Sequence, residues 1–338
     1  MYQWLKRLLA KPARAPAPAM PAPVAPQPPA PPPPVLPPAV VGGPDFEQKD
    51  LVDRSFQQWL FGLPDEDALD TTPAEQAVLK QLETAAQSGQ NAADMLRRMP
   101  GIIPQLLQSL RSENFAGAEI ARKMSNDLVL VGSVLRLASA AMQQNGENSA
   151  INSVEHAIIV IGQEGLRQLI TTVAFRPIID LQSGHYTRQM APRIWEQSEK
   201  SALACRMLAP EFGVDPFEAF LAGLVQNAGL LAALRLMDPA GEAAALGSAT
   251  FRARLQQEAR AISAGIAESW RFPPAVTRAI REQQLVRGAE PSPMARVLAL
   301  GDYLAKLRLL AANGVLDDTE HNLFHGLPLG AMPCYAAI

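Results

Sequence analysis

Four histidines and two cysteines are the side chains of this sequence that could bind a metal ion or act as nucleophiles. His321 and His325 are four residues apart, a spacing that places two zinc ligands on one face of a helix. Gly326 and Pro328 follow at once, and no cysteine or acidic residue has an obvious spacing for a third ligand. This pattern favours a solvated pair of surface histidines over a zinc site.

The other four side chains favour structural roles. His156 lies on the polar side of an apolar helical pattern, and His185 lies in the polar segment SGHYT, which is typical of a loop. Cys205 falls in the apolar run SALACRMLA, as a small core residue would, and Cys334 is too distant to suggest a structural disulfide. The sequence has no Walker-type phosphate loop, Gly-x-Ser-x-Gly turn or Cys-x-x-Cys pair. These residues therefore predict no catalytic site.

An uncharged polar pair, Gln226 and Asn227, interrupts the apolar sequence EAFLAGLVQNAGLL. This segment is predicted to be a helix, because Asp215 can cap it, Pro216 suits its first position and Glu218 completes a capping box. Apolar side chains on most sides indicate that the helix is buried. Gln226 and Asn227 are therefore expected inside the protein, where their amides need hydrogen-bond partners.

This helix and several other sequence segments resemble the HDOD family, the HD-related output domain of bacterial signalling proteins, and they occur in the same order as in that family. The similar phrases are MPGIIP at 99–104, the stretch at 119–142, INSVEHAIIVIGQEGLRQL at 151–169, WEQS at 195–198, WRFP at 270–273 and LALGDYL at 298–304. Ser139 stands where the family usually has asparagine. The resemblance implies an all-α, two-lobed domain over about 96–310, with a first lobe at about 96–181 and an HD-like second lobe at about 187–310.

Proteins of the wider HD superfamily bind metal through histidines and aspartates. The resemblance implies that other residue types replace most of these ligands in this sequence. It implies Gln197 for one histidine, Gln226 and Asn227 for the His-Asp pair, about Ala259 for a further histidine, Gln283 and Gln284 for a histidine pair, and Asp302 for a retained aspartate. Neutral amides are weak metal ligands, and a divalent cation needs several strong donors. We therefore expect a degenerate HD site with no metal or other cofactor, whose residues either bridge helices or line a pocket.

The resemblance implies a non-catalytic protein of bacterial signal transduction, acting through a protein partner or a small regulatory ligand. The alternative is a metal-dependent phosphohydrolase of the HD superfamily with an altered site, for which the retained Asp302 is the main support. Binding of nucleic acid is disfavoured, because residues 45–338 carry 26 basic and 33 acidic side chains.

Composition indicates a soluble helical protein. The chain is 48% hydrophobic and 6% aromatic, with little of the alternation that a sheet requires. No apolar run approaches the ~20 residues needed to cross a bilayer. We expect a cytoplasmic protein with reduced thiols.

The first 44 residues hold 15 of the 30 prolines, and residues 15–44 are predicted to be a disordered Pro/Ala-rich linker. Residues 1–14 form a short basic amphipathic segment. Its candidate docking residues are Trp4, Leu5, Leu8 and Leu9, at helical spacing, with Lys6 and Arg7. Three interpretations stay open: a helix that folds onto a protein partner or weakly onto the inner membrane surface, a helix that returns to its own domain, and a frayed tail.

Residues 45–95 are predicted to be a helical extension packed on the domain. One apolar face carries Val52, Phe56, Trp59 and Leu60, and the sequence Thr72 to Glu75 repeats the capping pattern. The segment SGHYTRQMAPR is predicted to connect the two lobes. Residues 311–338 turn polar and then rich in proline and glycine, so we expect a C-terminal tail that frays.

Overall fold

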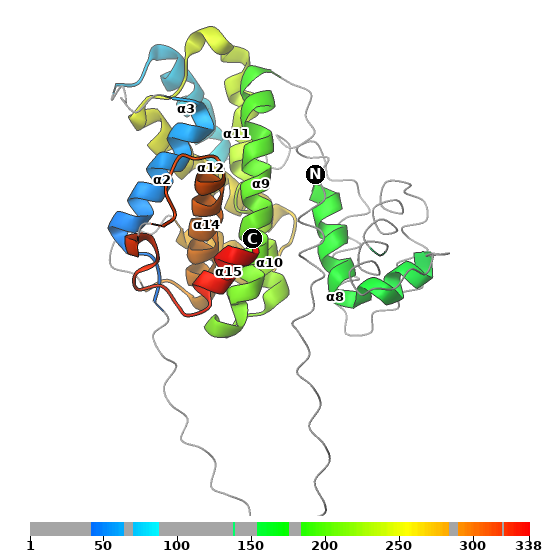
Figure 1. The fold of residues 1–338 in the computed structure, drawn as a ribbon. Helices are drawn as coiled ribbons and strands as arrows, with labels where there is room; N and C mark the ends of the chain where they lie inside the picture. Colours follow the sequence, from blue (N-terminus) through cyan, green and yellow to red (C-terminus); the bar gives the residue numbers. More distant parts are fainter. Residues whose placement is uncertain are drawn as a thin grey trace, which may run out of the picture.

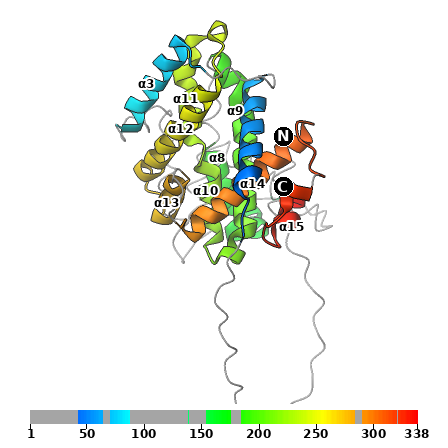
Figure 2. The same ribbon diagram turned by 90° about the vertical axis from the view of Figure 1, so that its left-hand side faces the viewer.

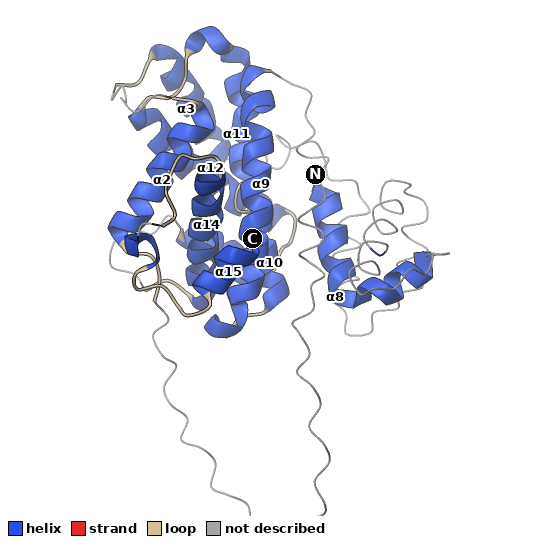
Figure 3. Cartoon of the chain, in the orientation of Figure 1, coloured by secondary structure: helices blue, strands red, loops and turns tan. Residues whose placement is uncertain are grey.

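The computed structural model describes residues 42–63, 70–87, 138, 154–175, 184–283, 290–319 and 321–338. All regular structure in these ranges is helical, which confirms the predicted all-α fold (Figure 3). Residues 1–14, almost all of the predicted linker, most of the first lobe and Gln284 lie outside the described residues. The docking residues Trp4, Leu5, Lys6, Arg7, Leu8 and Leu9 are among them, so that interpretation stays a prediction.

The described helices follow the chain from an N-terminal pair to a short C-terminal helix (Figure 1). They are α2 (Phe46–Phe61), α3 (Pro73–Gln87), α8 (Val154–Phe175), α9 (His185–Leu208), α10 (Pro216–Val225), α11 (Ala228–Met237), α12 (Ala249–Ser269), α13 (Pro274–Glu282), α14 (Pro293–Ala312) and α15 (Ala331–Ala337). Short 3-10 turns η2 (Ala209–Phe212), η3 (Asp238–Ala240), η4 (Glu242–Ala244) and η5 (His321–Phe324) join some of them.

Helix α9 runs along most of the height of the main helical body (Figure 1). It packs against α10 and α14 over much of its length and also contacts α2, α11 and α15. Apolar positions such as Met190, Ile194 and Ala202 are fully buried in these contacts. Polar side chains on the same helix, including Gln197 and Ser201, are buried as well, so α9 brings hydrogen-bonding groups into the core.

The predicted N-terminal extension packs on this body. Helix α2 buries Val52, Phe56 and Leu60 and lies over α14 (Figure 2), while Trp59 is half-buried under the guanidinium of Arg193. Helix α3 begins with the predicted capping box, in which Thr72 and Glu75 exchange hydrogen bonds. These contacts make α2 and α3 part of the same core as α9 and α14.

Glu75 has a second role in the capping box of α3. Its fully buried carboxylate also accepts hydrogen bonds from the backbone N–H groups of Gly247 and Ser248 and from the Ser248 hydroxyl. Burial alone would raise the pKa of Glu75, but these bonds and the one from Thr72 stabilise the carboxylate and hold its pKa below the usual value. One side chain thus joins α3 to the start of α12.

The segment SGHYTRQMAPR is not the predicted connection, because α9 begins at His185 and continues through Pro192. The helix starts there because Asp238 supplies the missing cap. Its carboxylate accepts hydrogen bonds from the backbone N–H groups of Gly184 and Thr187 and from the Thr187 hydroxyl. Because this capping residue is 51 positions away from Thr187 in sequence, no local sequence pattern predicts where the helix begins.

The predicted single helix around Gln226 and Asn227 is two helices. Asp215 caps α10 and Pro216 takes its first position as expected, but α10 ends at Val225 and α11 begins at Ala228. Asn227 has φ −98° and ψ 8°, outside the helical region, so the polar pair occupies a break between buried helices. The stretch 216–240 has the length and mean hydropathy (1.5) of a membrane span, yet 83% of its apolar window is buried in the fold.

The C-terminal residues pack on the body instead of fraying. The α15 residues Cys334 and Tyr335 are buried, and Lys200 donates a hydrogen bond to the carbonyl of Ile338. Gln48 on α2 donates to the carbonyls of Asn322 and His325. Partners more than 130 residues away in sequence therefore order a segment whose composition alone suggests a tail.

Glycines let the two halves of the broken helix lie close to their neighbours. A Cβ on Gly223 would come 2.7 Å from the Cα of Ala202 on α9. A Cβ on Gly229 would stand 2.7 Å from the backbone nitrogen of Ser263 and collide with the carbonyl of Ala259, both on α12. Backbone atoms cannot move aside as a flexible side chain can, so both helix contacts require glycine.

We expect Gly229→Ala to lower the free energy of unfolding by about 1–3 kcal/mol, because the added methyl group overpacks the contact between α11 and α12. Chemical denaturation of the purified full chain measures this change. Gly43→Ala is the matched control, since a Cβ there has nothing within 4 Å. Equal stability of the two variants would contradict the close packing of α11 on α12.

Candidate functional site

The structure brings together four of the seven residues that were predicted to replace or retain metal ligands. Helix α9 supplies Gln197, the break between α10 and α11 supplies Gln226 and Asn227, and α14 supplies Asp302. We call these four residues the amide cluster. Gln197, Asn227 and Asp302 are 1%, 8% and 9% exposed and lie inside the main body, whereas Gln226, which was also expected inside the protein, is only half-buried.

The cluster residues are hydrogen-bonded to one another across the helices. The Asn227 amide donates to Gln197 Oε1, and the Gln197 amide donates in turn to Asp302 Oδ1. Gln226 also donates to Asp302 Oδ1, at 3.2 Å. Three segments far apart in sequence are therefore connected through the single carboxylate of Asp302.

Serines on α9 and α12 complete the hydrogen bonds around the break. Asn227 Nδ2 donates to Ser198 Oγ (2.9 Å), and Gln226 Nε2 donates to Ser201 Oγ (2.7 Å). Ser263 on α12 donates to the carbonyl of Gln226 and accepts from the N–H of Gly229. Backbone groups that the broken helix leaves without internal partners are thus satisfied by a side chain.

A buried cation completes the site, and the sequence analysis did not identify it. Lys306, one helical turn after Asp302 on α14, is 5% exposed. Its ammonium donates to Asp302 Oδ2 (2.6 Å) and to Asp53 Oδ1 on α2 (2.7 Å), and it lies 5.6 Å from the centroid of the Phe56 ring. The i,i+4 spacing of Asp302 and Lys306 was a readable signal for their pairing, but nothing local indicated Asp53.

The charges in this region stabilise one another despite burial. Burial alone would lower the pKa of Lys306, but Asp302 and Asp53 raise it above the usual lysine value. Burial would likewise raise the pKa of Asp53, yet Lys306, with Arg260 and Lys49 nearby, holds it below the usual value. At neutral pH Lys306 is therefore an ammonium, and Asp53 beside it is a carboxylate.

These residues do not suit a divalent metal ion. Gln197, Gln226 and Asn227 offer neutral amides that already bond to one another or to serines, and both oxygens of Asp302 are engaged. An ammonium 2.6 Å from Asp302 Oδ2 would repel a second cation. The described residues also contain no group of three or more histidine, cysteine or acidic side chains that could hold a metal.

Of the remaining predicted positions, Gln283 makes its hydrogen bonds outside the cluster. Gln283 donates to the backbone carbonyls of Ala279 and Ala295, which ties α13 to α14, and Gln284 is outside the described residues. Ala259 is buried and has only a methyl group to offer. The functional assignment of the whole predicted set stays a prediction.

His185, His325 and the two cysteines are not among the residues hydrogen-bonded in the cluster either. His185 is the first residue of α9, and His325 is exposed beside η5. Cys205 and Cys334 are buried and free, and burial raises the pKa of the Cys334 thiol to about 12. A thiol held neutral in this way is a poor nucleophile at physiological pH.

Comparison with known proteins identifies the fold. The profile of the HDOD domain matches residues 96–286, more than half of the chain. No curated protein matches the sequence. An HDOD domain protein of unknown function from Geobacter sulfurreducens has a similar structure, with a TM-score of 0.53 at 17% identity over 76% of this chain and 88% of that one.

Two proteins from Shewanella amazonensis are also similar. One, provisionally named a metal-dependent phosphohydrolase, has a TM-score of 0.54 at 16% identity and covers 79% of this chain and 98% of its own. The other, provisionally named a phosphohydrolase, has a TM-score of 0.50 at 23% identity and covers 77% and 97%. At these identities the likeness concerns the fold alone.

We expect Asn227→Ala to lower the melting temperature in the absence of any ligand. The change leaves acceptors on Gln197 and Ser198 without their donor, at about 1–3 kcal/mol for each buried group. Gln81→Ala, an exposed amide on α3, is the control and should leave the temperature unchanged. An unaltered melting temperature for Asn227→Ala, together with loss of a bound ligand, would mean that the pair lines a pocket instead.

Lys306→Met should destabilise the fold by about 3–5 kcal/mol near neutral pH, because it leaves two carboxylates without their buried cation. The raised pKa of Lys306 determines how its contribution to stability depends on pH. The contribution of Lys306 is full below the ordinary lysine pKa of about 10.4 and is lost as the pH rises through the higher folded-state pKa. Urea denaturation at pH 7 and at strongly alkaline pH, with exposed Lys80→Met as control, measures both effects. A loss no larger than that of the control at pH 7 would contradict this role.

Proposed function

This chain belongs to the HDOD domain family, and we propose that it is a non-catalytic regulatory protein that acts by binding a protein partner or a small ligand. The observation that carries the proposal is the set of hydrogen bonds that Asp302 accepts. Its two oxygens accept hydrogen bonds from Gln197, Gln226 and Lys306, so the retained acid is a structural acceptor inside the core.

The alternative is a metal-dependent phosphohydrolase with an altered site. Such an enzyme needs a cation that polarises the phosphate and activates water. Lys306 supplies a positive charge but cannot replace that metal, because an ammonium is not a Lewis acid that can coordinate water, and this one is paired with two protein carboxylates. The cluster therefore favours a role in holding helices together over a role in hydrolysis.

A binding role also agrees with the context in which similar folds occur. A protein from Marinobacter aquaeolei, provisionally named a signal transduction protein, has a TM-score of 0.50 at 19% identity and covers 85% of this chain and 63% of its own. The name applies to the Marinobacter protein alone, and at this low identity the comparison concerns only the fold. For this chain we propose a protein partner or a small regulatory ligand, with residues 1–14 as a second docking segment.

The test is elemental analysis of the purified full chain together with an assay for hydrolysis of a cyclic dinucleotide. We expect no stoichiometric zinc, manganese or iron, and no hydrolysis above background when those metals are added, because the amide cluster offers a single carboxylate that is already neutralised. Asp302→Asn is the companion variant. About one metal per chain, or metal-dependent hydrolysis, abolished by Asp302→Asn would overturn the proposal.

A further inference from the structure

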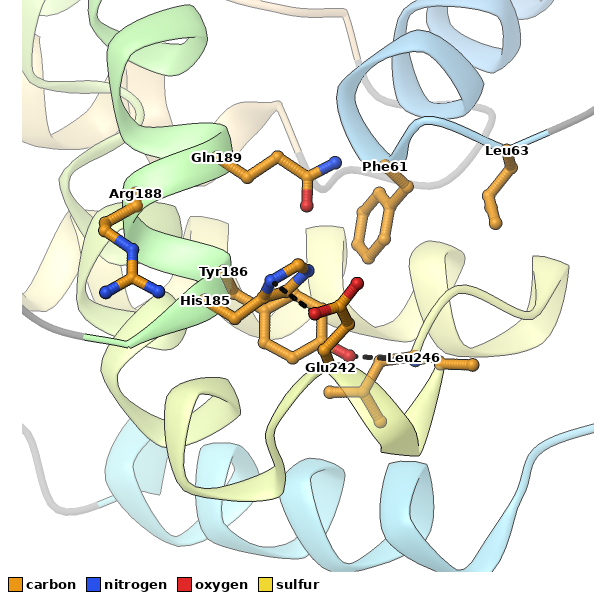
Figure 4. Close-up of a pocket in the computed structure, with 9 residues that line it drawn as sticks. Phe61, Leu63, His185, Tyr186, Arg188, Gln189, Glu242 and Leu246 are labelled. Atoms are coloured by element: carbon orange, nitrogen blue, oxygen red, sulfur yellow. Dashed lines mark hydrogen bonds and ion pairs between the residues drawn. The ribbon is translucent and has the colours of Figure 1, made fainter.

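A pocket of about 470 Å³ lies at the start of α9 (Figure 4). Its walls come from the end of α2, the first turns of α9 and the segment that follows η3. The main lining side chains are Phe61, Leu63, His185, Tyr186, Gln189 and Glu242. The pocket and the cluster are separate, because twelve residues of helix between His185 and Gln197 correspond to about 18 Å.

The pocket is held open by contacts that do not depend on a ligand. The Tyr186 hydroxyl accepts a hydrogen bond from the backbone N–H of Leu246, which fixes the floor. Arg193 donates to the carbonyls of Trp59 and Leu60 and so secures the end of α2. Phe61 stands edge-to-face with Phe251, at 6.3 Å between ring centroids and 89° between the planes. These walls resemble the preformed, partly apolar sites that bind small molecules.

Backbone strain supports a function for this pocket. Ala245, which lines it, has φ 45° and ψ 49°, a left-handed conformation that non-glycine residues rarely adopt. The side chain of Ala245 is a methyl group and can make no hydrogen bond to offset the strain. Strained residues of this kind concentrate at ligand sites, where the surrounding structure holds them in place.

The polar groups of the pocket define the chemistry that it could recognise. Figure 4 shows the Gln189 amide, the His185 ring and the Glu242 carboxylate directed towards the space in front of the Phe61 ring. The Glu242 carboxylate lies 3.8 Å from His185 Nδ1, and 83% of its side chain is exposed, so its oxygens can accept further hydrogen bonds. An ionised carboxylate only accepts, which selects ligands with adjacent N–H donors.

We propose that this pocket binds a planar nitrogen heterocycle of purine nucleoside size, stacked on Phe61, whose adjacent ring and amino N–H groups donate to Glu242. Gln189 offers both a donor and an acceptor to the remaining polar edge of the ring. Stacking on an aromatic side chain tolerates many heterocycles, so the choice between them depends on Glu242. The inference rests on the proposed function and deepens it, because it names the class of small ligand.

Guanosine and adenosine are suitable probes, because guanine presents adjacent ring and amino N–H donors and adenine does not. Ligand-observed NMR and titration calorimetry on the full chain should show saturable binding, with guanosine bound more tightly. Glu242→Gln should weaken guanosine binding about tenfold and remove the preference over adenosine, since it replaces a charge-assisted acceptor pair. Phe61→Leu should weaken both nucleosides.

Glu196→Gln, an exposed acid on α9 outside the pocket, is the matched control and should bind both nucleosides as the unmodified chain does. Melting temperatures of all variants establish that they are folded. Absence of saturable binding, or a guanosine preference that persists in Glu242→Gln, would overturn the inference. Neither result bears on the proposed function, which would fail through metal-dependent hydrolysis at Asp302 whatever this pocket binds.

Discussion

The ammonium of Lys306, held between Asp302 and Asp53, is the interaction on which the described core depends. A buried charge is tolerated only when it is paired and hydrogen-bonded, and here the two acids come from different helices, α14 and α2. Asp302 in turn accepts from Gln197 on α9 and from Gln226 at the break between α10 and α11. One cation thus determines how four segments of the chain meet.

This arrangement extends the domain beyond the residues that the family profile matches. The profile covers 96–286, whereas Lys306, Asp302 and Asp53 all lie outside it. Helix α2 is consequently part of the core and not a linker, because its removal would leave Lys306 with one carboxylate and uncover the apolar face of α14. The C-terminal segment is also part of the core, because Gln48 on α2 donates hydrogen bonds to the carbonyls of Asn322 and His325.

Helix α9 carries two chemically different sites, one near its middle and one at its start. Near its middle, Gln197, Ser198 and Ser201 are buried and fully engaged with other protein groups. At its start, His185 and Gln189 border an open pocket and keep hydrogen-bonding capacity. A site whose polar groups satisfy one another stabilises the fold, whereas a site with spare donors and acceptors can recognise a ligand. This contrast separates the structural role of the cluster from the binding role proposed for the pocket.

The sequence by itself determined the helical class, the apolar face of α2 and the caps of α3 and α10, because local spacing carries that information. The grouping of Gln197, Gln226, Asn227 and Asp302 was implied by the resemblance to the HDOD family. Only the tertiary structure decided the break at Gln226 and Asn227, the helical start at His185 and the place of Asp53 beside Lys306. Each of these depends on a partner distant in the chain: Ser263 for the break, Asp238 for the helix start and α2 for the cation. Hydrogen bonds and ion pairs between distant residues have no period or spacing in sequence, so composition and local pattern could not predict them.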